Sequence, residues 1–346
     1  MSLLQRTRIR PSPGKGRKGR PPPKVMPRYC SISVYGQDRL TIVNVEDVSN
    51  PYIEVSIYSA NLDGTYFNDV TSDYKILIVT AVNADRVTIF DISDPSNPSF
   101  LGSLQNSTYL DYAVGVHNVN DVYVIVIAYY GDYINSIDIS DPSNPTIVDS
   151  LHQVDGPWLV DIQSNYAYIT WKLDDSFGIV DISDVINLTL LSKITATSLD
   201  SSGCPRVDDD YAYVTAYSAD SLNVIDISDP SSPSIVSVYK SRIIDGAAGV
   251  DKQHTYVYVC GYVSDTLAIL NVDDPSNPTL VGYVEDSTLL YGCEYVKVCN
   301  GYAYVTVAPG DRFTIVDVSD PTNPIIVSSI HDVVLLDEAI GLSFIF

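Results

Sequence analysis

The eight residues DISDPSNP occur twice, at Asp91–Pro98 and again at Asp138–Pro145. Looser copies of this octapeptide follow the same rhythm along the chain: NVEDVSNP at Asn44–Pro51, DISDVINL at Asp181–Leu188, DISDPSSP at Asp226–Pro233, NVDDPSNP at Asn271–Pro278 and DVSDPTNP at Asp317–Pro324. Seven copies result, and neighbouring copies begin 43 to 47 residues apart. A regular period of this length indicates an array of structural repeats.

Each copy lies within the same pattern of short, strand-like runs. An apolar run such as FTIVD leads into the octapeptide, and a β-rich run such as TLVGYV follows it. A tyrosine-rich run such as DYAYVT lies upstream, preceded by a fourth short segment. Val, Ile, Tyr and Thr dominate these runs, turn-forming residues bound them, and none has helical periodicity. Four strands in about 45 residues are typical of a propeller blade, so we predict an all-β, seven-bladed β-propeller.

The octapeptide itself is predicted to form a turn. Asp-Pro places proline at the second position of a turn, where its fixed φ is favourable, and Ser-Asn-Pro continues the turn through local side-chain hydrogen bonds. This turn is expected to link the third strand of a blade to its outer fourth strand. A calcium site at Asp91 and Asp94 is the alternative, although the spacing lacks the glycine-containing loop of a known calcium motif.

The two ends of the array predict how the ring closes. No innermost strand precedes the first copy, whereas a surplus segment follows the seventh outer strand. The end of that segment, AIGLSFIF (Ala339–Phe346), resembles an innermost strand such as YAVGVHNV. We therefore expect the C-terminal strand to complete the first blade beside Cys30–Tyr35, which would leave no open sheet edge in the ring.

The repeats resemble those of the LVIVD-repeat family. The resemblance rests on GIVDISD, NVIDISDPSSP and TIVDVSDPTNP with YAYV upstream, and it covers about residues 29–346. The fourth blade departs most, because Val185 and Leu188 replace the two prolines. The resemblance implies a β-propeller in a surface-associated or adhesive setting, and it carries no catalytic residues.

The first 28 residues differ in composition from the rest of the chain. They contain no acidic residue and nine basic ones: Arg6, Arg8, Arg10, Lys15, Arg17, Lys18, Arg20, Lys24 and Arg28. The chain has 20 basic and 43 acidic residues, so residues 29–346 keep 11 and 43, and the two parts carry charges of +9 and −32. We expect a Pro- and Gly-rich arm over residues 1–28 and a propeller over 29–346. The arm lacks the apolar segment of a secretory signal, and we expect no transmembrane segment.

A recurring aspartate stands just before most of the predicted innermost strands. Six carboxylates are therefore expected at one mouth of the central channel: Asp63, Asp111, Asp155, Asp200, Asp245 and Asp337. Such a ring would attract a divalent cation or basic side chains. The alternative is that each aspartate only caps a turn, since glycine follows three of the six.

The sequence indicates a non-enzymatic interaction protein without a cofactor. The four histidines lack metal-ligand spacing, the five cysteines form no CxxC pair, and no nucleophile–base arrangement stands out. We expect a scaffold that assembles into a particle, filament or surface layer when its arm binds another protein subunit, most simply another copy. Two alternatives stay open: a ligand- or metal-binding propeller, or an enzyme, at the acidic channel mouth; and nucleic-acid contact through the arm.

Overall fold

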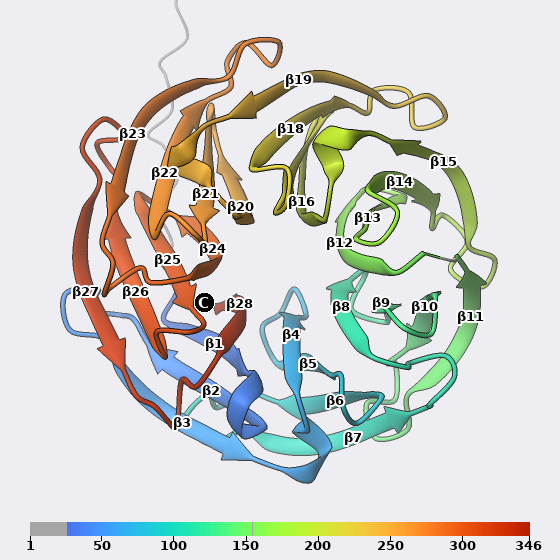
Figure 1. Ribbon diagram of the computed structural model, residues 1–346. Coiled ribbons are helices and arrows are strands. Elements are labelled where there is room, and N and C mark those ends of the chain that lie inside the picture. The colour runs from blue at the N-terminus through green and yellow to red at the C-terminus, as the bar shows by residue number, and fades with distance from the viewer. Residues whose placement is uncertain (1–25, 154) are drawn as a thin grey trace, which may run out of the picture.

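Seven four-stranded antiparallel sheets surround a central axis in the computed structural model, which describes residues 26–153 and 155–346 (Figure 1). The predicted seven-bladed propeller is confirmed. Eight of the basic arm residues lie outside the described residues: Arg6, Arg8, Arg10, Lys15, Arg17, Lys18, Arg20 and Lys24. Within the described part of the chain, no helix has the length and apolar character needed to cross a membrane.

The strands of each blade run from the channel to the rim. The innermost strands are β28 (Ala339–Ile345), β4 (Thr65–Val70), β8 (Ala113–Asn118), β12 (Pro157–Gln163), β16 (Ser202–Asp208), β20 (Ala247–Gln253) and β24 (Cys293–Cys299). The second strands are β1 (Tyr29–Val34), β5 (Ile76–Ala81), β9 (Tyr123–Ala128), β13 (Tyr166–Trp171), β17 (Tyr211–Ala216), β21 (Tyr256–Gly261) and β25 (Tyr302–Val307).

The remaining strands complete the blades toward the rim. The third strands are β2 (Arg39–Asn44), β6 (Arg86–Asp91), β10 (Tyr133–Asp138), β14 (Ser176–Asp181), β18 (Ser221–Asp226), β22 (Thr266–Asn271) and β26 (Arg312–Asp317). The outermost strands are β3 (Tyr52–Tyr58), β7 (Ser99–Gln105), β11 (Thr146–His152), β15 (Thr189–Thr195), β19 (Ser234–Lys240), β23 (Thr279–Glu285) and β27 (Ile325–His331). The short 3-10 turns are η1 (Tyr35–Gln37), η2 (Ala60–Leu62), η3 (Thr197–Leu199) and η4 (Arg242–Ile244).

The apolar core lies between blades. The second strand of each blade has one partly exposed residue followed by five buried ones, because neighbouring blades cover both of its faces. Leu40 and Ile42 of the first blade, for example, belong to one cluster with Leu77 and Val79 of the second. The outermost strands are covered on one face, so exposure alternates along β19.

The C-terminal strand closes the ring as predicted. β28 pairs antiparallel with β1, with Phe344 opposite Cys30 and Leu342 opposite Ile32, so the first sheet has the order β28-β1-β2-β3 (Figure 1). Arg28 directly precedes β1, and its backbone N–H donates to the carbonyl of Ile345 while its side chain forms an ion pair with Glu46. The first and the last of the described strands are thus held in one blade.

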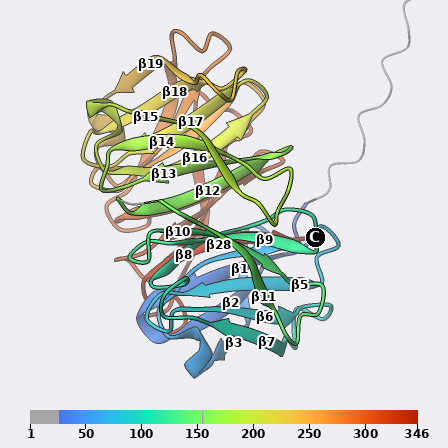
Figure 2. The same ribbon diagram turned by 90° about the vertical axis from the view of Figure 1, so that its right-hand side faces the viewer.

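The strands run between the two flat faces of the ring. Figure 2 shows the ring from its side. One face carries the octapeptide turns between third and fourth strands, such as Asp91–Pro98, and we call it the octapeptide face. The other carries the turns between second and third strands, from Asp38 in the first blade to Asp311 in the seventh, and we call it the hairpin face. Innermost strands begin at the hairpin face and end at the octapeptide face.

The octapeptides form turns that use their own carboxylates. The backbone N–H groups of Ser93 and Ser96 donate to the carboxylates of Asp91 and Asp94 at 2.8 and 3.1 Å, and both serine hydroxyls donate to the same oxygens. This agrees with the predicted link from β6 to β7. The two carboxylates named in the calcium alternative are therefore engaged in local hydrogen bonds.

An aspartate at each hairpin joins one blade to the next. The seven members all have positive φ, a conformation that Asp tolerates better than most residues: Asp38, Asp85, Asp132, Asp175, Asp220, Asp265 and Asp311. Each accepts a hydrogen bond of 2.9 to 3.3 Å from the N–H of the residue just before the next innermost strand. The contact recurs at all seven junctions between blades. It explains why an aspartate directly precedes the third strand of each blade.

Removal of residues 339–346 should destabilise the whole ring, because β1 then loses its inner partner β28 and becomes an unpaired edge. We expect a much lower melting temperature, together with aggregation visible in light scattering. Deletion of Phe346 alone, which lies beyond the end of β28, is the matched control and should have a small effect. Equal melting temperatures for the full chain and the eight-residue deletion would contradict this closure.

Candidate functional site in the central channel

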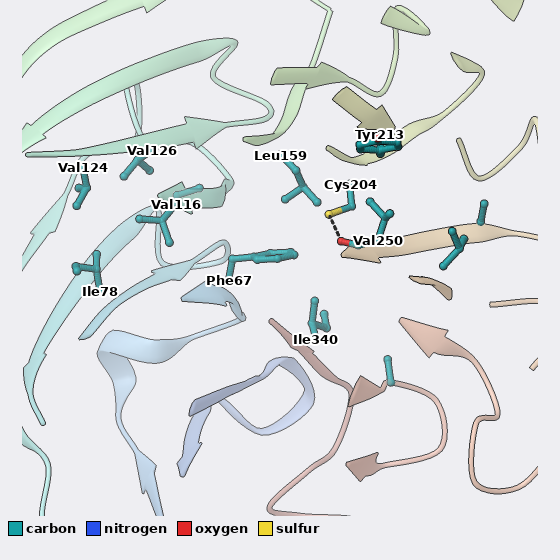
Figure 3. Packing of buried hydrophobic residues seen from close by; sticks show 14 of the residues in the cluster. Phe67, Ile78, Val116, Val124, Val126, Leu159, Cys204, Tyr213, Val250 and Ile340 are labelled. Atoms are coloured by element: carbon teal, nitrogen blue, oxygen red, sulfur yellow. Dashed lines mark hydrogen bonds between the residues drawn. The ribbon is translucent and has the colours of Figure 1, made fainter. Parts of the chain in front are cut away.

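Side chains divide the central channel into two cavities. Phe67, Leu159, Cys204 and Tyr295 line both cavities and so form the partition between them. Figure 3 shows Phe67, Leu159 and Cys204 converging on the channel centre. The cavity toward the octapeptide face has a volume of about 50 Å³, and the one toward the hairpin face has a volume of about 70 Å³.

Charged side chains of alternating sign ring the cavity toward the octapeptide face. They come from the fifth residue of six innermost strands and are, in order around the channel, Asp69, His117, Asp161, Arg206, Asp251 and Lys297. Ser343 takes the equivalent position in β28. We call these six side chains the charge belt. Their order places an acidic group between basic groups, so neighbouring blades attract one another at the channel wall.

Direct contacts run through most of the charge belt. Asp161 bridges two blades, because its carboxylate lies 3.1 Å from His117 Nε2 and 3.5 Å from an Arg206 guanidinium nitrogen. Arg206 Nε also lies 2.9 Å from the Asp251 carboxylate. Backbone N–H groups of the following blades complete the set, since Val207 donates to Asp161 at 2.7 Å. The charges of the belt are largely satisfied within it, which is typical of a structural network.

Two pKa shifts follow from these contacts. Burial raises the pKa of the Asp161 carboxyl, but Arg206 and His117 outweigh burial and bring the pKa down to about 2. Burial lowers the pKa of His117, but Asp69 and Asp161 outweigh it and the net pKa is raised. Both ring nitrogens of His117 face acceptors, the Asn118 carbonyl and the Asp161 carboxylate, and only the doubly protonated ring donates to both. His117 therefore stabilises the fold below its unfolded pKa, and this contribution is lost as the pH rises through its folded pKa.

Asp161→Asn should destabilise the propeller most near neutral pH. The substitution keeps an acceptor for Val207 but removes the charge between His117 and Arg206, at a cost of about 3 kcal/mol in the free energy of unfolding. The Asp161 contribution is present above its unfolded pKa and is lost as the pH falls toward the folded value of about 2. In urea unfolding, the difference from the wild type should therefore shrink as the pH falls below about 4. Asp155→Asn, at an exposed position, is the control; equal stability of Asp161→Asn and wild type at pH 7 would refute the bridge.

Aromatic side chains form the wall of the cavity toward the hairpin face. Tyr66 and Trp158 meet edge to face with their ring centroids 5.5 Å apart, and Tyr129 packs against the other side of Trp158 at 5.0 Å. The aromatic group continues outward to Tyr130, which is 62% exposed. Tyr217 lines the cavity from the fifth blade. The wall of this cavity is therefore largely aromatic.

Two oppositely charged side chains enter this aromatic cavity. Lys172 follows β13, and its ammonium lies 4.0 Å from the centroid of the Trp158 ring. Glu294 lies in β24, where desolvation, opposed by Lys172, raises the pKa of its carboxyl to about 7. Desolvation likewise lowers the pKa of Lys172, with Glu294 opposing. Within residues 26–153 and 155–346, neither side chain has an ion-pair partner within 4 Å or a side-chain hydrogen bond.

Glu294→Gln should stabilise the protein at alkaline but not at acidic pH. A carboxyl whose folded pKa is about 7, above the ordinary 4.5, stabilises the fold while protonated and destabilises it increasingly as the pH rises from 4.5 to 7. Removing the charge should gain at most about 3 kcal/mol at pH 8, since one pKa unit corresponds to about 1.4 kcal/mol. Thermal unfolding at about pH 4 and pH 8 measures the effect. A melting-temperature difference that stays constant between the two values would show that the carboxyl is not desolvated.

The six aspartates predicted to ring the channel mouth lie at the hairpin face, immediately before innermost strands. Asp63, Asp155 and Asp200 are exposed, and the other three are partly buried. Within the described part of the chain, the interactions pair these residues with hairpin residues: Asp245 with Asp220, Asp111 with Asp85, Asp337 with Asp311, and Asp63 with Asn83. No described interaction joins two of the six. Binding of a cation or a basic peptide there stays a prediction, and the residues that the structure describes contain no group of three or more potential metal ligands.

The charge belt and the aromatic cavity were not predicted from the sequence. The belt could have been found by aligning the innermost strands, since its members recur at intervals of 44 to 48 residues. Lys172 could have been found as an exception to the repeat. It directly follows the second strand of its blade, and in four other blades this position holds a tyrosine: Tyr35, Tyr129, Tyr217 and Tyr262. Glu294 has no such signal, because the second residue of an innermost strand varies freely.

Sequence profiles identify the repeats. The LVIVD repeat matches residues 80–106, 123–152, 158–195, 206–241, 253–286 and 293–332, which together make up more than half of the chain. The chain belongs to the LVIVD-repeat family. A search of curated proteins finds no significant match. Membership accounts for the octapeptides, which lie in the matched segments from the second blade onward.

Several solved structures resemble this LVIVD-repeat protein in fold. A functionally unknown protein from Desulfotomaculum acetoxidans has a TM-score of 0.76 at 11% identity, with 92% of this chain and 98% of that chain covered. A periplasmic gluconolactonase from Pseudomonas aeruginosa has a TM-score of 0.76 at 11% identity, with 92% and 99% covered. A protein from Lactobacillus plantarum has a TM-score of 0.74 at 14% identity, with 93% and 100% covered. Identities this low establish a shared fold and no shared activity.

Proposed function

We propose that the protein is a non-enzymatic interaction scaffold that self-assembles when the basic N-terminal arm of one copy binds the hairpin face of another. The observation that carries this proposal is the set of carboxylate pairs on that face. Each pair joins a hairpin aspartate to an aspartate that precedes the next innermost strand, as in Asp220 with Asp245 and Asp311 with Asp337.

These carboxylate pairs carry unfavourable energy in the isolated ring. Desolvation, a hydrogen bond that protonated Asp245 donates to the Asp220 carboxylate, and repulsion by the Asp220 charge raise the pKa of Asp245. Desolvation and repulsion by Asp337 raise the pKa of Asp311, against the opposing N–H of Glu338. A guanidinium or ammonium group placed between two such carboxylates relieves the repulsion, and arginine matches a carboxylate with two parallel hydrogen bonds.

The arm has the charge and length for this role. Residues 1–25 carry eight of the nine basic residues, opposite a ring with a charge of −32. A Pro-rich extended chain advances about 3 Å per residue, so 25 residues span roughly 75 Å. That length is sufficient to cross a neighbouring ring. Arg28 already pairs with Glu46 in its own first blade, so we assign the intermolecular role to residues 1–25.

The charge belt supports a scaffold over an enzyme. A catalytic acid or base needs a free proton-transfer position, whereas Asp161 and Arg206 are each held between two partners of opposite charge. These three ion pairs hold four blades in a fixed relation. They favour a rigid ring that presents its faces to a partner.

Light scattering of three proteins at low and high salt tests the assembly. The full chain should associate at about 20 mM salt and dissociate at about 500 mM, because salt screens contacts between exposed charges. Deletion of residues 1–25, and a full-length variant with the eight arm cations replaced by Gln, should both stay monomeric. Asp245→Asn combined with Asp337→Asn should also weaken association while leaving the melting temperature unchanged or raised.

Two outcomes would reject this function. If the full chain stays monomeric at low salt, the arm does not bind the ring. If it binds DNA instead, with an affinity that falls steeply with salt and vanishes on deletion of residues 1–25, the arm contacts nucleic acid. Asp220→Ala serves as a folding control, because it removes the acceptor for the Gly246 N–H and should lower stability, unlike Asp245→Asn.

A further inference from the structure

We propose that the aromatic cavity toward the hairpin face binds a neutral sugar ring, with Glu294 and Lys172 as its hydrogen-bonding groups and aromatic side chains as its walls. This proposal goes beyond the assembly function and does not depend on the arm. The cavity is lined by residues of the second, fourth, fifth, sixth and seventh blades, so only the closed ring forms it.

The cavity exists because equivalent positions carry side chains of very different size. The second residue of the innermost strand is Tyr66 in the second blade and Trp158 in the fourth, but Gly203 in the fifth and Ala248 in the sixth. The large rings therefore face an open side. Phe67, Leu159 and Cys204 close the floor, where Figure 3 shows them meeting at the channel centre.

Glu294 and Lys172 point to a ligand that both donates and accepts hydrogen bonds. Both side chains are half-buried, and within the described residues neither has a hydrogen-bond or ion-pair partner, although the Lys172 ammonium lies over the Trp158 ring. Polar groups withdrawn from water without a partner are costly, and a ligand that satisfies them recovers that cost. A carboxylate accepts from hydroxyl groups and an ammonium donates to them, so a polyol satisfies both at once.

The charged side chains in and around the cavity disfavour ionic ligands. An anion would be repelled by Glu294 and by the aspartate pairs at the rim, such as Asp220 with Asp245. A simple cation would be repelled by Lys172 inside the cavity. The carboxylate of a zwitterion would have to pass the acidic rim. A neutral ligand meets none of these barriers.

The aromatic walls select a ring among neutral polyols. A pyranose has hydroxyl groups at its edge and apolar C–H groups on its faces, so it can stack on an indole or phenol ring while its edge makes hydrogen bonds. Tyr66 and Tyr217 line the cavity with phenol rings, and Trp158 lines it with an indole over which the Lys172 ammonium lies. Apolar and aromatic walls with a few convergent polar groups are typical of small-molecule sites. A linear polyol would lose the stacking contact.

Calorimetry on the full-length protein, with tryptophan fluorescence as a second readout, tests this site. The probes are the methyl glycosides of glucose, galactose and mannose at concentrations up to about 50 mM, above the millimolar affinity expected of a single sugar ring. At least one should bind and change the emission of Trp158, whereas Trp171 is fully buried. Glu294→Gln, Lys172→Met and the cavity-filling Ala248→Leu should each weaken binding at least about tenfold.

Lys193→Met is the matched control. Lys193 also lies over a tryptophan, 4.6 Å from the centroid of the Trp171 ring, but it does not line the cavity. This variant should bind the glycoside like the wild type. All variants are compared at equal folded fraction, measured by thermal unfolding, so a loss of binding is not a loss of fold.

Two results would overturn the proposal. One is the absence of binding for all three glycosides at the highest concentration in a folded wild-type protein. The other is binding of arginine amide that becomes tighter in Lys172→Met, because removal of Lys172 favours a cation and disfavours a sugar. The monomer or oligomer state plays no part in either result, so failure here leaves the assembly proposal untouched.

Discussion

The pairing of β28 with β1 is the constraint on which the rest of the structure depends. A propeller made of consecutive blades would leave a gap between the first and the last, with two unprotected sheet edges. Here the last strand, β28, is part of the first blade, so antiparallel pairing along Tyr29–Val34 bridges the gap. Closure also fixes the channel, because Ile340 and Leu342 belong to this strand and pack in clusters with neighbouring blades.

Once the ring is closed, two circular sets of contacts hold the blades in register. At the hairpin face, seven aspartates with positive φ accept N–H groups from the following blade. At the channel wall, the charge belt joins blades through Asp161 and Arg206. The first set is repeated in every blade and is architectural. The second differs from blade to blade, as does the aromatic cavity, and such departures from the repeat are where a binding function can arise.

The fold could be predicted from the sequence, because the strands and turns of each blade are recognisable in its own segment. The number of octapeptide copies also equals the number of blades. The closing strand could be predicted from the missing and surplus segments at the ends. The site could not be predicted to the same degree. Asp245 and Asp337 were found by position, but their partners Asp220 and Asp311 come from hairpins of the preceding blade. Trp158 and Lys172 come from the fourth blade and Glu294 from the seventh. These three side chains line one cavity only because the ring is closed, and no local sequence pattern encodes that arrangement.

We propose the hairpin face as the surface through which copies of the protein bind one another. Cross-linking with a reagent that couples amines to carboxylates, followed by mass spectrometry on a mixture of isotopically light and heavy protein, tests this most directly. We expect intermolecular links from Lys15, Lys18 and Lys24 to hairpin-face carboxylates such as Asp245 and Asp337. Links directed instead to octapeptide-face carboxylates such as Asp91 and Asp226, or found only within one copy, would contradict it.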